Sequence, residues 1–355
     1  MTVYTAYRGG LWIVDPAVPR VDRRLAGRTV ECVASSPDAP GRVFAGTSGD
    51  GLYRSVDGGG SFGRVDLAHD PSLDSPDGAV ADAGADAEAA TDPGESRSIT
   101  ALAVSPHDPD EVWVGTEPSR VHRSTDGGDS FERLDGLTDV PSASEWSFPP
   151  RPHTHHVRWI EPCPADPVRW YVGIEAGALL VTPDAGETWI DRPAGSPRDT
   201  HTLATHPDAP DRVYAAAGDG YAESDDRGRT WAAPDAGLDH GYVWGLAVDP
   251  ADPGTVLVSA ASDATAAHRR GEAYLYRKRA AVATTGAHET WERLQGRGLP
   301  TGDGTYRAVL ASGSVDDGMF ALNDRGLYRT ADAGDSFERV SVDLPAEPPR
   351  AMAVG

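Results

Sequence analysis

Short runs of apolar residues, separated by glycine, proline and aspartate, recur along the whole 355-residue chain. Within a run, apolar and polar positions alternate and β-branched or aromatic residues are common. No stretch sustains the 3.6-residue period of a helix, so the runs predict short β-strands. Two segments, Thr29–Val65 and Ser98–Leu134, can be aligned run for run. Each contains four such runs in the same order, which predicts four antiparallel strands and is typical of a propeller blade.

The repeat unit begins again at four further positions, His155, Thr200, Tyr242 and Tyr306. Strand-like segments remain at both ends of the chain, three between residues 2 and 25 and one at Ala351–Val354. If the C-terminal segment pairs with the N-terminal three, it completes a seventh blade and leaves no open sheet edge. We therefore predict a single all-β domain over residues 1–355, a seven-bladed β-propeller of four-stranded antiparallel blades.

Five units carry the same polar motif, Ser/Thr-x-Asp-x-Gly-x-Ser/Thr followed by Phe or Trp. Its aspartates are Asp57, Asp126, Asp184, Asp226 and Asp332. In a turn between the third and fourth strands, the carboxylate accepts hydrogen bonds from backbone N–H groups and the glycine permits a left-handed backbone. The aromatic ring is then buried between sheets. We therefore predict a structural role, not a catalytic one, for these aspartates. One unit keeps only Thr284, Gly286, His288, Thr290 and Trp291 of the motif.

With these five motif copies, the chain resembles the Asp-box, or BNR-repeat, propellers over essentially its whole length. That superfamily includes sialidases, sortilin-type receptors, xyloglucan-active glycosidases and photosystem II assembly factors. The resemblance implies the propeller fold. For a relative of the enzymes it implies an active site on the face opposite the Asp boxes, and for a relative of the assembly factors it implies a non-catalytic role. One fold carries many activities, so the resemblance does not choose among them.

The formal charge of -23 and the single lysine, Lys278, set the protein apart from nucleic-acid and membrane-surface binders. Like charges would repel nucleic acid and anionic lipid over the whole surface. Such a surface suits concentrated salt, which screens self-repulsion, so we expect a halophilic, haloarchaeal member of the superfamily; a GC-rich genome would also explain the arginine bias. No apolar run is long enough to span a membrane, and Met1–Gly10 lacks the features of a signal peptide. We expect a cytoplasmic monomer in which Cys32 and Cys163 are buried free thiols.

One insertion interrupts the repeat. Residues 66–95 are rich in Asp, Ala, Gly and Pro and contain almost no large apolar side chain. Such a segment cannot bury enough apolar surface to order itself, so we predict an acidic, disordered loop there.

The ligand-binding face is predicted from blade topology. The Pro/Asp turns and the Asp motifs share one face, so the connections between blades and the loops after each second strand share the other. The first strand of each blade lines the central channel, and the residues that open it would contact a ligand at the channel mouth. Together with one loop residue, these candidates are Arg8, His155, His156, Arg158, Trp159, His201, Tyr242, Trp244, Tyr306 and Arg307.

The first functional hypothesis is non-catalytic recognition. No nucleophile–base pair is visible in the sequence, and the assembly-factor resemblance implies binding without chemistry. The partner would be a small molecule, a glycan or a protein segment at the channel mouth.

The second hypothesis is a glycoside hydrolase-like enzyme, which needs two carboxyl groups on either side of the scissile bond. The catalytic candidates are Glu175 and Asp219, which occupy equivalent loops of adjacent blades, together with Asp199. A true sialidase is not expected, because the resemblance would require an Arg-Ile-Pro sequence that this chain lacks. Arg8, Arg158 and Arg307 could form an anion clamp.

The third hypothesis is a metal-dependent enzyme in which His155, His201 and a carboxylate bind a divalent ion, the only cofactor that the sequence leaves open. No metal-binding spacing such as His-Glu-x-x-His occurs. Alternation along a strand also sends His155 and His156 to opposite sides of the sheet, so both are not expected to bind one ion.

Overall fold

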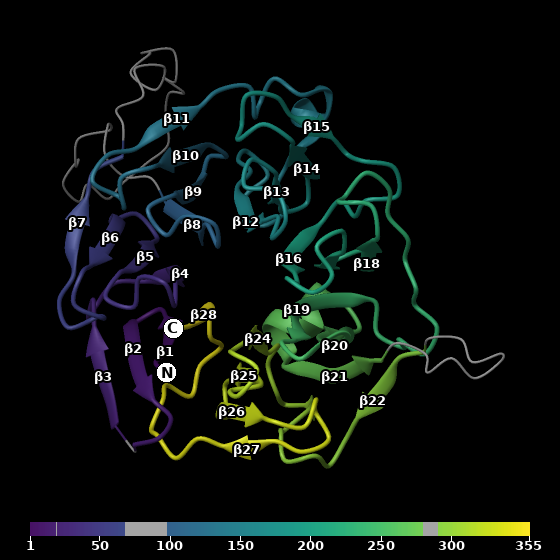
Figure 1. The fold of residues 1–355 in the computed structure, drawn as a ribbon. Coiled ribbons are helices and arrows are strands. Elements are labelled where there is room, and N and C mark those ends of the chain that lie inside the picture. The colour runs from purple at the N-terminus through teal and green to yellow at the C-terminus, as the bar shows by residue number, and fades with distance from the viewer. Residues whose placement is uncertain (19, 68–97, 280–289) are drawn as a thin grey trace, which may run out of the picture.

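The computed structural model describes residues 1–18, 20–67, 98–279 and 290–355. These residues form seven antiparallel sheets arranged in a ring around a central axis (Figure 1). The seven-bladed propeller predicted from the repeat is therefore confirmed. Of the insertion 66–95, only Asp66 and Leu67 are described, so the prediction of disorder lies outside the described residues. The same holds for Thr284, Gly286 and His288 of the degenerate motif.

The sheets follow one another along the chain. The first contains β28 (Ala351–Val354), β1 (Val3–Tyr7), β2 (Gly10–Asp15) and β3 (Arg20–Arg24). The second contains β4 (Val30–Ser35), β5 (Val43–Thr47), β6 (Gly51–Ser55) and β7 (Gly63–Val65). The third contains β8 (Ser98–Val104), β9 (Val112–Glu117), β10 (Val121–Ser124) and β11 (Glu132–Leu134). The fourth contains β12 (Val157–Pro162), β13 (Trp170–Ile174), β14 (Ala178–Thr182) and β15 (Ile190–Asp191).

The remaining three sheets complete the ring. The fifth contains β16 (Thr200–Thr205), β17 (Val213–Ala217) and β18 (Gly220–Ser224). Its outer edge is only an isolated bridge between Glu223 and Ala232. The sixth contains β19 (Tyr242–Asp249), β20 (Asp252–Ala261), β21 (Glu272–Lys278) and β22 (Glu292–Leu294), with β23 (Gly302–Asp303) beside β21. The seventh contains β24 (Val309–Ser312), β25 (Met319–Asn323), β26 (Gly326–Thr330) and β27 (Glu338–Arg339).

The C-terminal strand closes the ring as the sequence predicted. β28 pairs antiparallel with β1, with Val354 opposite Val3, so the two ends of the chain lie side by side (Figure 1). This pairing removes the open edge that β1 would otherwise present.

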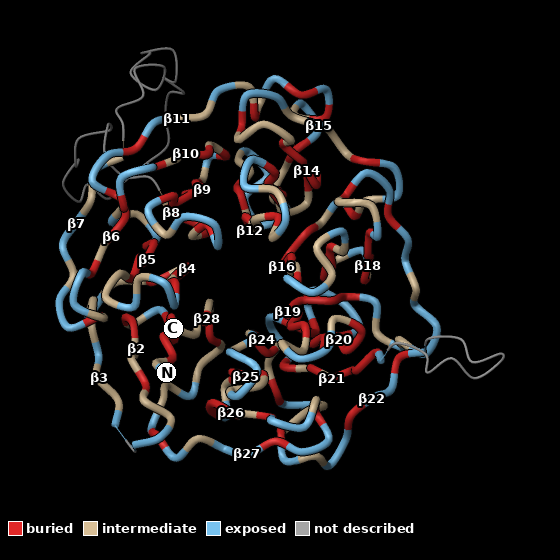
Figure 2. Tube along the Cα trace, in the orientation of Figure 1, coloured by how far each residue is buried: buried red, intermediate tan, exposed pale blue. Residues whose placement is uncertain are grey.

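Burial is generally greatest in the second strand of a blade and least in the outermost strand (Figure 2). Every residue of the second strands β5, β13, β17 and β25 is buried, because neighbouring blades cover both faces. The outermost strands are largely exposed. Trp113 and Trp170 stack between two blades with ring centroids 4.4 Å apart. Cys32 and Cys163 are buried free thiols, as predicted.

Glycines in three second strands allow this packing. A Cβ atom at Gly46 would lie 2.5 Å from Ile99, and one at Gly115 would lie 2.5 Å from Val157. At Gly173 a Cβ atom would lie 2.7 Å from Thr200 Cγ2. The first strand of each following blade therefore packs directly on the backbone of the preceding one.

The five motif aspartates lie in the turns that follow the third strands. In the Asp126 turn, Oδ1 accepts from Ser124 Oγ at 2.7 Å and from the Ser130 backbone N–H at 2.9 Å, and Oδ2 accepts from Ser130 Oγ at 2.6 Å. The same bonds recur around Asp57, Asp184, Asp226 and Asp332. These hydrogen bonds lower the pKa of Asp57 to about 2.

Candidate functional site

The inner strands carry β-bulges at equivalent positions. In five of them the pairing with the second strand skips one residue. The skipped residues are Glu31, Thr100, Arg158, His201 and Trp244. A bulge re-aims its side chain away from the ordinary alternation of the strand. Two of these side chains then link neighbouring blades, because Thr100 Oγ1 donates to the Val157 carbonyl at 2.6 Å and His201 Nδ1 donates to the Val243 carbonyl at 2.8 Å.

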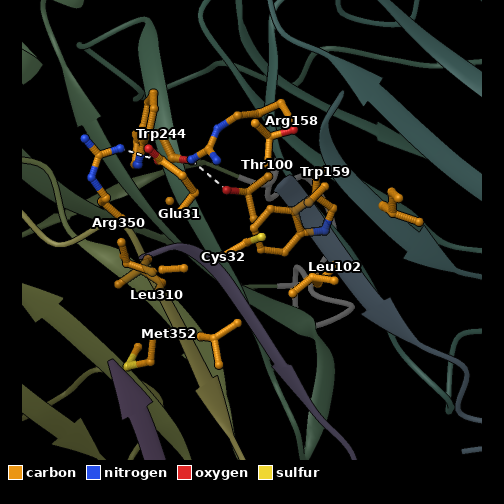
Figure 3. Close-up of a pocket in the computed structure, with 17 residues that line it drawn as sticks. Glu31, Cys32, Thr100, Leu102, Arg158, Trp159, Trp244, Leu310, Arg350 and Met352 are labelled. Atoms are coloured by element: carbon orange, nitrogen blue, oxygen red, sulfur yellow. Dashed lines mark hydrogen bonds and ion pairs between the residues drawn. The ribbon is translucent and has the colours of Figure 1, made fainter. Parts of the chain in front are cut away.

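A cavity of about 120 Å³ lies on the propeller axis, and all seven inner strands or the residues directly beside them contribute to its wall (Figure 3). Part of the wall is apolar, with Leu102, Leu310 and Met352. Charged side chains come from three blades, since Glu31, Arg158 and Arg350 also line it. Trp159 and Trp244 supply the aromatic surface.

Two arginines lie over the Trp244 ring, and a third, Arg350, is close enough to affect the pKa of Arg307. The guanidinium carbon of Arg158 lies 4.7 Å from the Trp244 ring centroid, and that of Arg307 lies 4.0 Å from it, both within cation–π range. Arg350 forms an ion pair with Glu31 (Figure 3). Burial, together with the charges of Arg158 and Arg350, lowers the pKa of Arg307 to about 9. The cavity therefore concentrates positive charge within a molecule of net charge -23.

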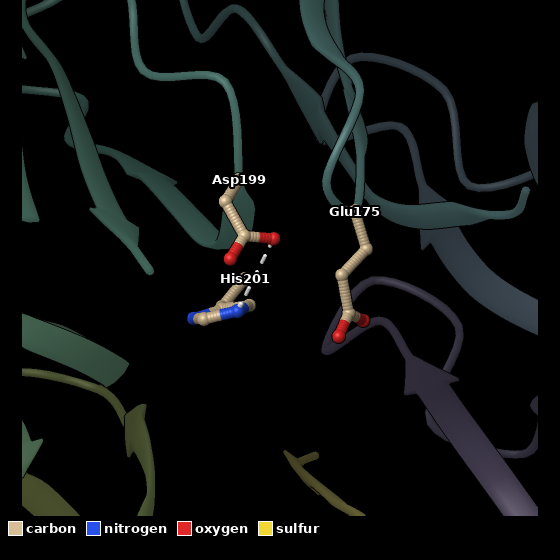
Figure 4. Close-up of side chains that lie close together, drawn as sticks. All are labelled: Glu175, Asp199 and His201. Carbon is tan, nitrogen blue, oxygen red and sulfur yellow. Dashed lines mark ion pairs between the residues drawn. The ribbon is translucent and has the colours of Figure 1, made fainter. Parts of the chain in front are cut away.

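Two carboxylates and an imidazole meet beside these arginines (Figure 4). Glu175 follows β13, Asp199 precedes β16, and His201 is the bulged residue of β16. One ligand atom from each side chain lies within 4.8 Å of those of the other two. His201 is fully buried, and its Nε2 lies 3.7 Å from Asp199 Oδ1.

The two carboxylates differ in their surroundings. Burial opposes ionisation of Glu175, but the hydrogen bond and charge of His156 outweigh it, together with His201 and Arg158, and lower the pKa of Glu175 to about 2. His156 Nε2 lies 2.9 Å from Glu175 Oε2, and Arg158 Nε lies 3.4 Å from the same oxygen. Burial raises the pKa of Asp199, and the charge of Glu175 adds to this shift while His201 opposes it. The pKa values of the two carboxyl groups are therefore shifted in opposite directions.

A chain of hydrogen bonds sets the tautomers of two histidines. Arg307 Nε donates to His268 Nδ1 at 3.0 Å, so neutral His268 carries its proton on Nε2, which donates to the Tyr242 hydroxyl at 2.8 Å. That hydroxyl lies 3.4 Å from His201 Nε2. Burial lowers the pKa of His201 and favours its neutral form. Because the Val243 carbonyl can only accept, neutral His201 keeps its proton on Nδ1 and a lone pair on Nε2.

The structure brings many of the sequence candidates together. Around the cavity and the carboxylate cluster lie His156, Arg158, Trp159, Glu175, Asp199, His201, Tyr242, Trp244 and Arg307.

Four candidates lie elsewhere. The Asp219 carboxylate accepts from the backbone N–H groups of Arg198 and Asp199, so it supports the loop and is not part of the cluster with Glu175. The His155 ring packs edge-on against Trp146 at 5.4 Å, and His155 is not in the cluster with His201. Arg8 is exposed on a β1–β2 turn. The Tyr306 hydroxyl lies 3.4 Å from the Arg269 carbonyl.

Three residues of the site were not identified from the sequence. Glu31 and Arg350 line the cavity, and His268 reaches the mouth from a short π-helix, η4 (Ala266–Arg270). Glu31 occupies the same bulge position as Arg158, so alignment of the repeats could have found it. The insertion that carries His268 has no counterpart in the other blades, so its direction could not be derived from the repeat.

No protein-family model matches this sequence, and no curated protein sequence matches it. Solved structures with the same fold include an ancestral GH74 enzyme, 17% identical with a TM-score of 0.60, over 96% of this chain and 40% of that one. The GH74 enzyme of Niastella koreensis is 16% identical with a TM-score of 0.64, over 94% of this chain and 50% of that one. This chain therefore spans half or less of either GH74 enzyme.

In a second group of structural matches, the alignment covers most of both chains. YCF48 bound to a D1 peptide is 14% identical with a TM-score of 0.56, over 88% of this chain and 82% of that one. At such identities these likenesses show a shared β-propeller fold. Among the described helices, none is long and apolar enough to cross a membrane.

Proposed function

We propose that this protein is a non-catalytic recognition propeller that binds an acidic group of a partner protein segment in the mouth of its central channel. The observation that carries the proposal is the arginine cluster around the axial cavity. Within the described part of the chain, Arg350 Nε has no hydrogen-bond partner, and the contact of Arg158 Nε is the long ion pair of 3.4 Å with Glu175 Oε2. Buried donors of this kind are rare, and an anionic ligand would satisfy them.

The charge distribution supports an anion as the ligand. Arg158, Arg307 and Arg350 face Glu31 and Glu175, which leaves an excess of positive charge next to the cavity. A carboxylate entering there would gain charge-assisted hydrogen bonds from guanidinium groups. The strongly negative remainder of the surface would repel anions elsewhere, so binding would be confined to the channel.

The extent of the structural matches favours a protein segment as the partner. YCF48 corresponds to this chain over most of both lengths, and one YCF48 structure holds a peptide. The GH74 enzymes are at least twice as long as the part that this chain matches. Membership of the Asp-box superfamily belongs to the same proposal, supported by the five motif turns.

A sugar-active enzyme is the second candidate, and one observation favours it. The carboxylates of Glu175 and Asp199 lie close together, and their pKa values shift in opposite directions, as an acid and a nucleophile require. Against it, Glu175 is already paired with His156 and Arg158, and neither carboxylate lines the axial cavity. Hydrolysis of xyloglucan oligosaccharides that is lost in both Glu175→Gln and Asp199→Asn would favour the enzyme.

Calorimetric titration tests the binding proposal. The probes are 12-residue peptides that end in Asp-Asp or in Asn-Asn-amide, so that only charge differs. We expect the acidic peptide alone to bind, and Arg307→Met to weaken it by about 2–5 kcal/mol because a buried charge pair is lost. The control Arg20→Met alters an arginine of the exposed strand β3 and should leave affinity unchanged. Equal binding of both peptides, or equal effects of both substitutions, would refute the proposal.

A further inference from the structure

The cluster of Glu175, Asp199 and His201 has features that recognition of an anion does not explain. It belongs to two adjacent blades, with Glu175 from the fourth sheet and the other two residues from the fifth (Figure 4). Two ionised carboxylates placed this close repel each other.

The imidazole of His201 presents a ligand atom to this cluster. Its side chain is fully buried, and Nδ1 donates to the Val243 carbonyl. Nε2 therefore carries a lone pair and lies 3.7 Å from Asp199 Oδ1. When Asp199 is ionised, both atoms are acceptors and neither has a proton to donate to the other. Among the described residues, the one hydrogen-bond contact of Nε2 is with the Tyr242 hydroxyl at 3.4 Å, a distance at the long limit. A histidine whose other nitrogen donates to a carbonyl is the form that ligates metals.

The two carboxylates are also held in place from outside the cluster. Asp199 Oδ1 accepts from the Ala176 N–H at 2.7 Å, and Glu175 Oε2 lies 2.9 Å from His156 Nε2. Asp199 Oδ2 lies so close to Gly218 that a Cβ atom there would be 1.9 Å away. Outer contacts of this kind orient the ligands of metal sites.

We propose that Glu175, Asp199 and His201 form a binding site for a divalent transition-metal ion of the Zn²⁺ class. One imidazole and two carboxylates suit such an ion better than Mg²⁺ or Ca²⁺, which prefer oxygen ligands alone. Three protein ligands leave a coordination position for water or for a ligand group.

The geometry requires only a small adjustment. Ligand atoms about 2.1 Å from a tetrahedral ion are about 3.4 Å apart. The three ligand atoms lie within 4.8 Å of one another, so the cluster would close around an ion by side-chain rotation. Glu175 would bind through Oε1, because His156 and Arg158 contact Oε2.

Titration of the full-length, chelator-treated protein with CoCl₂ and ZnCl₂ tests this site. We expect one Co²⁺ per chain, visible d–d absorption bands and displacement of Co²⁺ by Zn²⁺. Asp199→Asn and Glu175→Gln should each weaken Co²⁺ binding at least about tenfold, because each replaces a charged ligand by a neutral one of the same shape. His153→Gln is the control for adventitious binding, since this histidine is exposed and near the mouth.

Gly218→Ala provides a test that retains all three ligands. Its Cβ atom would displace the Asp199 carboxylate, and weaker Co²⁺ binding is expected, with the circular dichroism spectrum of the metal-free protein unchanged. Loss of Co²⁺ binding in Asp199→Asn and Glu175→Gln, but not in His153→Gln, supports the site. Absence of stoichiometric binding by the unsubstituted protein, or equal affinity in all variants, overturns it.

Discussion

Substitution of Gly173 by alanine should loosen the contact between the fourth and fifth blades beneath the channel mouth. Gly173 lies in β13, where the first strand of the next blade, β16, packs on its backbone. A Cβ atom at this position would lie 2.7 Å from Thr200 Cγ2 and 2.9 Å from Thr200 Cβ. The φ of Gly173 is not positive, so alanine adds no backbone strain and the steric overlap is the destabilising effect. Thr200 is fully buried and cannot move into solvent.

The expected magnitude follows from this overlap. Adding a methyl group to a packed core costs about 1–3 kcal/mol. Gly63→Ala is the matched control, because Gly63 lies on the exposed strand β7, has no positive φ and has no atom within 4 Å of an added Cβ. There, the substitution should stabilise the protein by about 0.4–1 kcal/mol, since it restricts the unfolded chain. Because alanine restricts the unfolded chain at both positions, this contribution cancels, and the free energies of unfolding of the two variants should differ by the overlap cost of about 1–3 kcal/mol.

Urea unfolding at constant NaCl, followed by the fluorescence of the nine tryptophans, measures this difference. The midpoint for Gly173→Ala should fall below that of the unsubstituted protein, and the midpoint for Gly63→Ala should equal or exceed it. Equal midpoints for the two variants would refute the packing argument.

Three further predictions concern charge and protonation. The lowered pKa of Asp57, about 2, means that its turn stabilises the fold above the ordinary aspartate pKa of about 4 and loses this contribution as pH falls toward 2. In an acid titration followed by circular dichroism, Asp57→Asn should lose less stability between about pH 4 and about pH 2 than the unsubstituted protein does. The same pH profile for both proteins would contradict the assignment. The melting temperature should rise between 0.1 and 1 M NaCl because salt screens a charge of -23, and a constant or falling value would count against it. At pH 7, ¹⁵N NMR should show His201 protonated on Nδ1 and His268 on Nε2, and the opposite tautomers would rule out the Arg307-to-His201 hydrogen-bond chain.

The fold could be predicted because its determinants are local and repeated. Alternating runs specify the strands, and the motif around Asp126 specifies a turn through bonds that span four residues. Ring closure was also predictable, since Ala351–Val354 was the one segment able to complete the N-terminal sheet.

The site was less predictable, for reasons that particular residues illustrate. Glu175 and Asp219 occupy equivalent loops, yet Asp219 bonds to the backbone N–H groups of Arg198 and Asp199, and Asp199 takes its place beside Glu175. Repeat position alone does not reveal such a contact between loops. His268 lies in an insertion outside the repeat pattern, and its partner Arg307 comes from the next blade.

The bulges explain much of the remaining difference. Strict alternation would place Arg158 and His201 on one face of their sheets, but an extra residue in each inner strand re-aims the side chain. The shift depends on pairing with the second strand, so it becomes visible only in the assembled blade.

A crystal structure of the protein with the acidic 12-residue peptide tests the central claim most directly. The account predicts a peptide carboxylate in the channel mouth, with oxygens about 2.7–3.2 Å from Arg350 Nε or Arg158 Nε. Among the described residues, Arg350 Nε has no hydrogen-bond partner and Arg158 Nε has the 3.4 Å ion pair with Glu175. A peptide bound on the face that carries the Asp126 and Asp184 turns, with these arginines uncontacted, would contradict it.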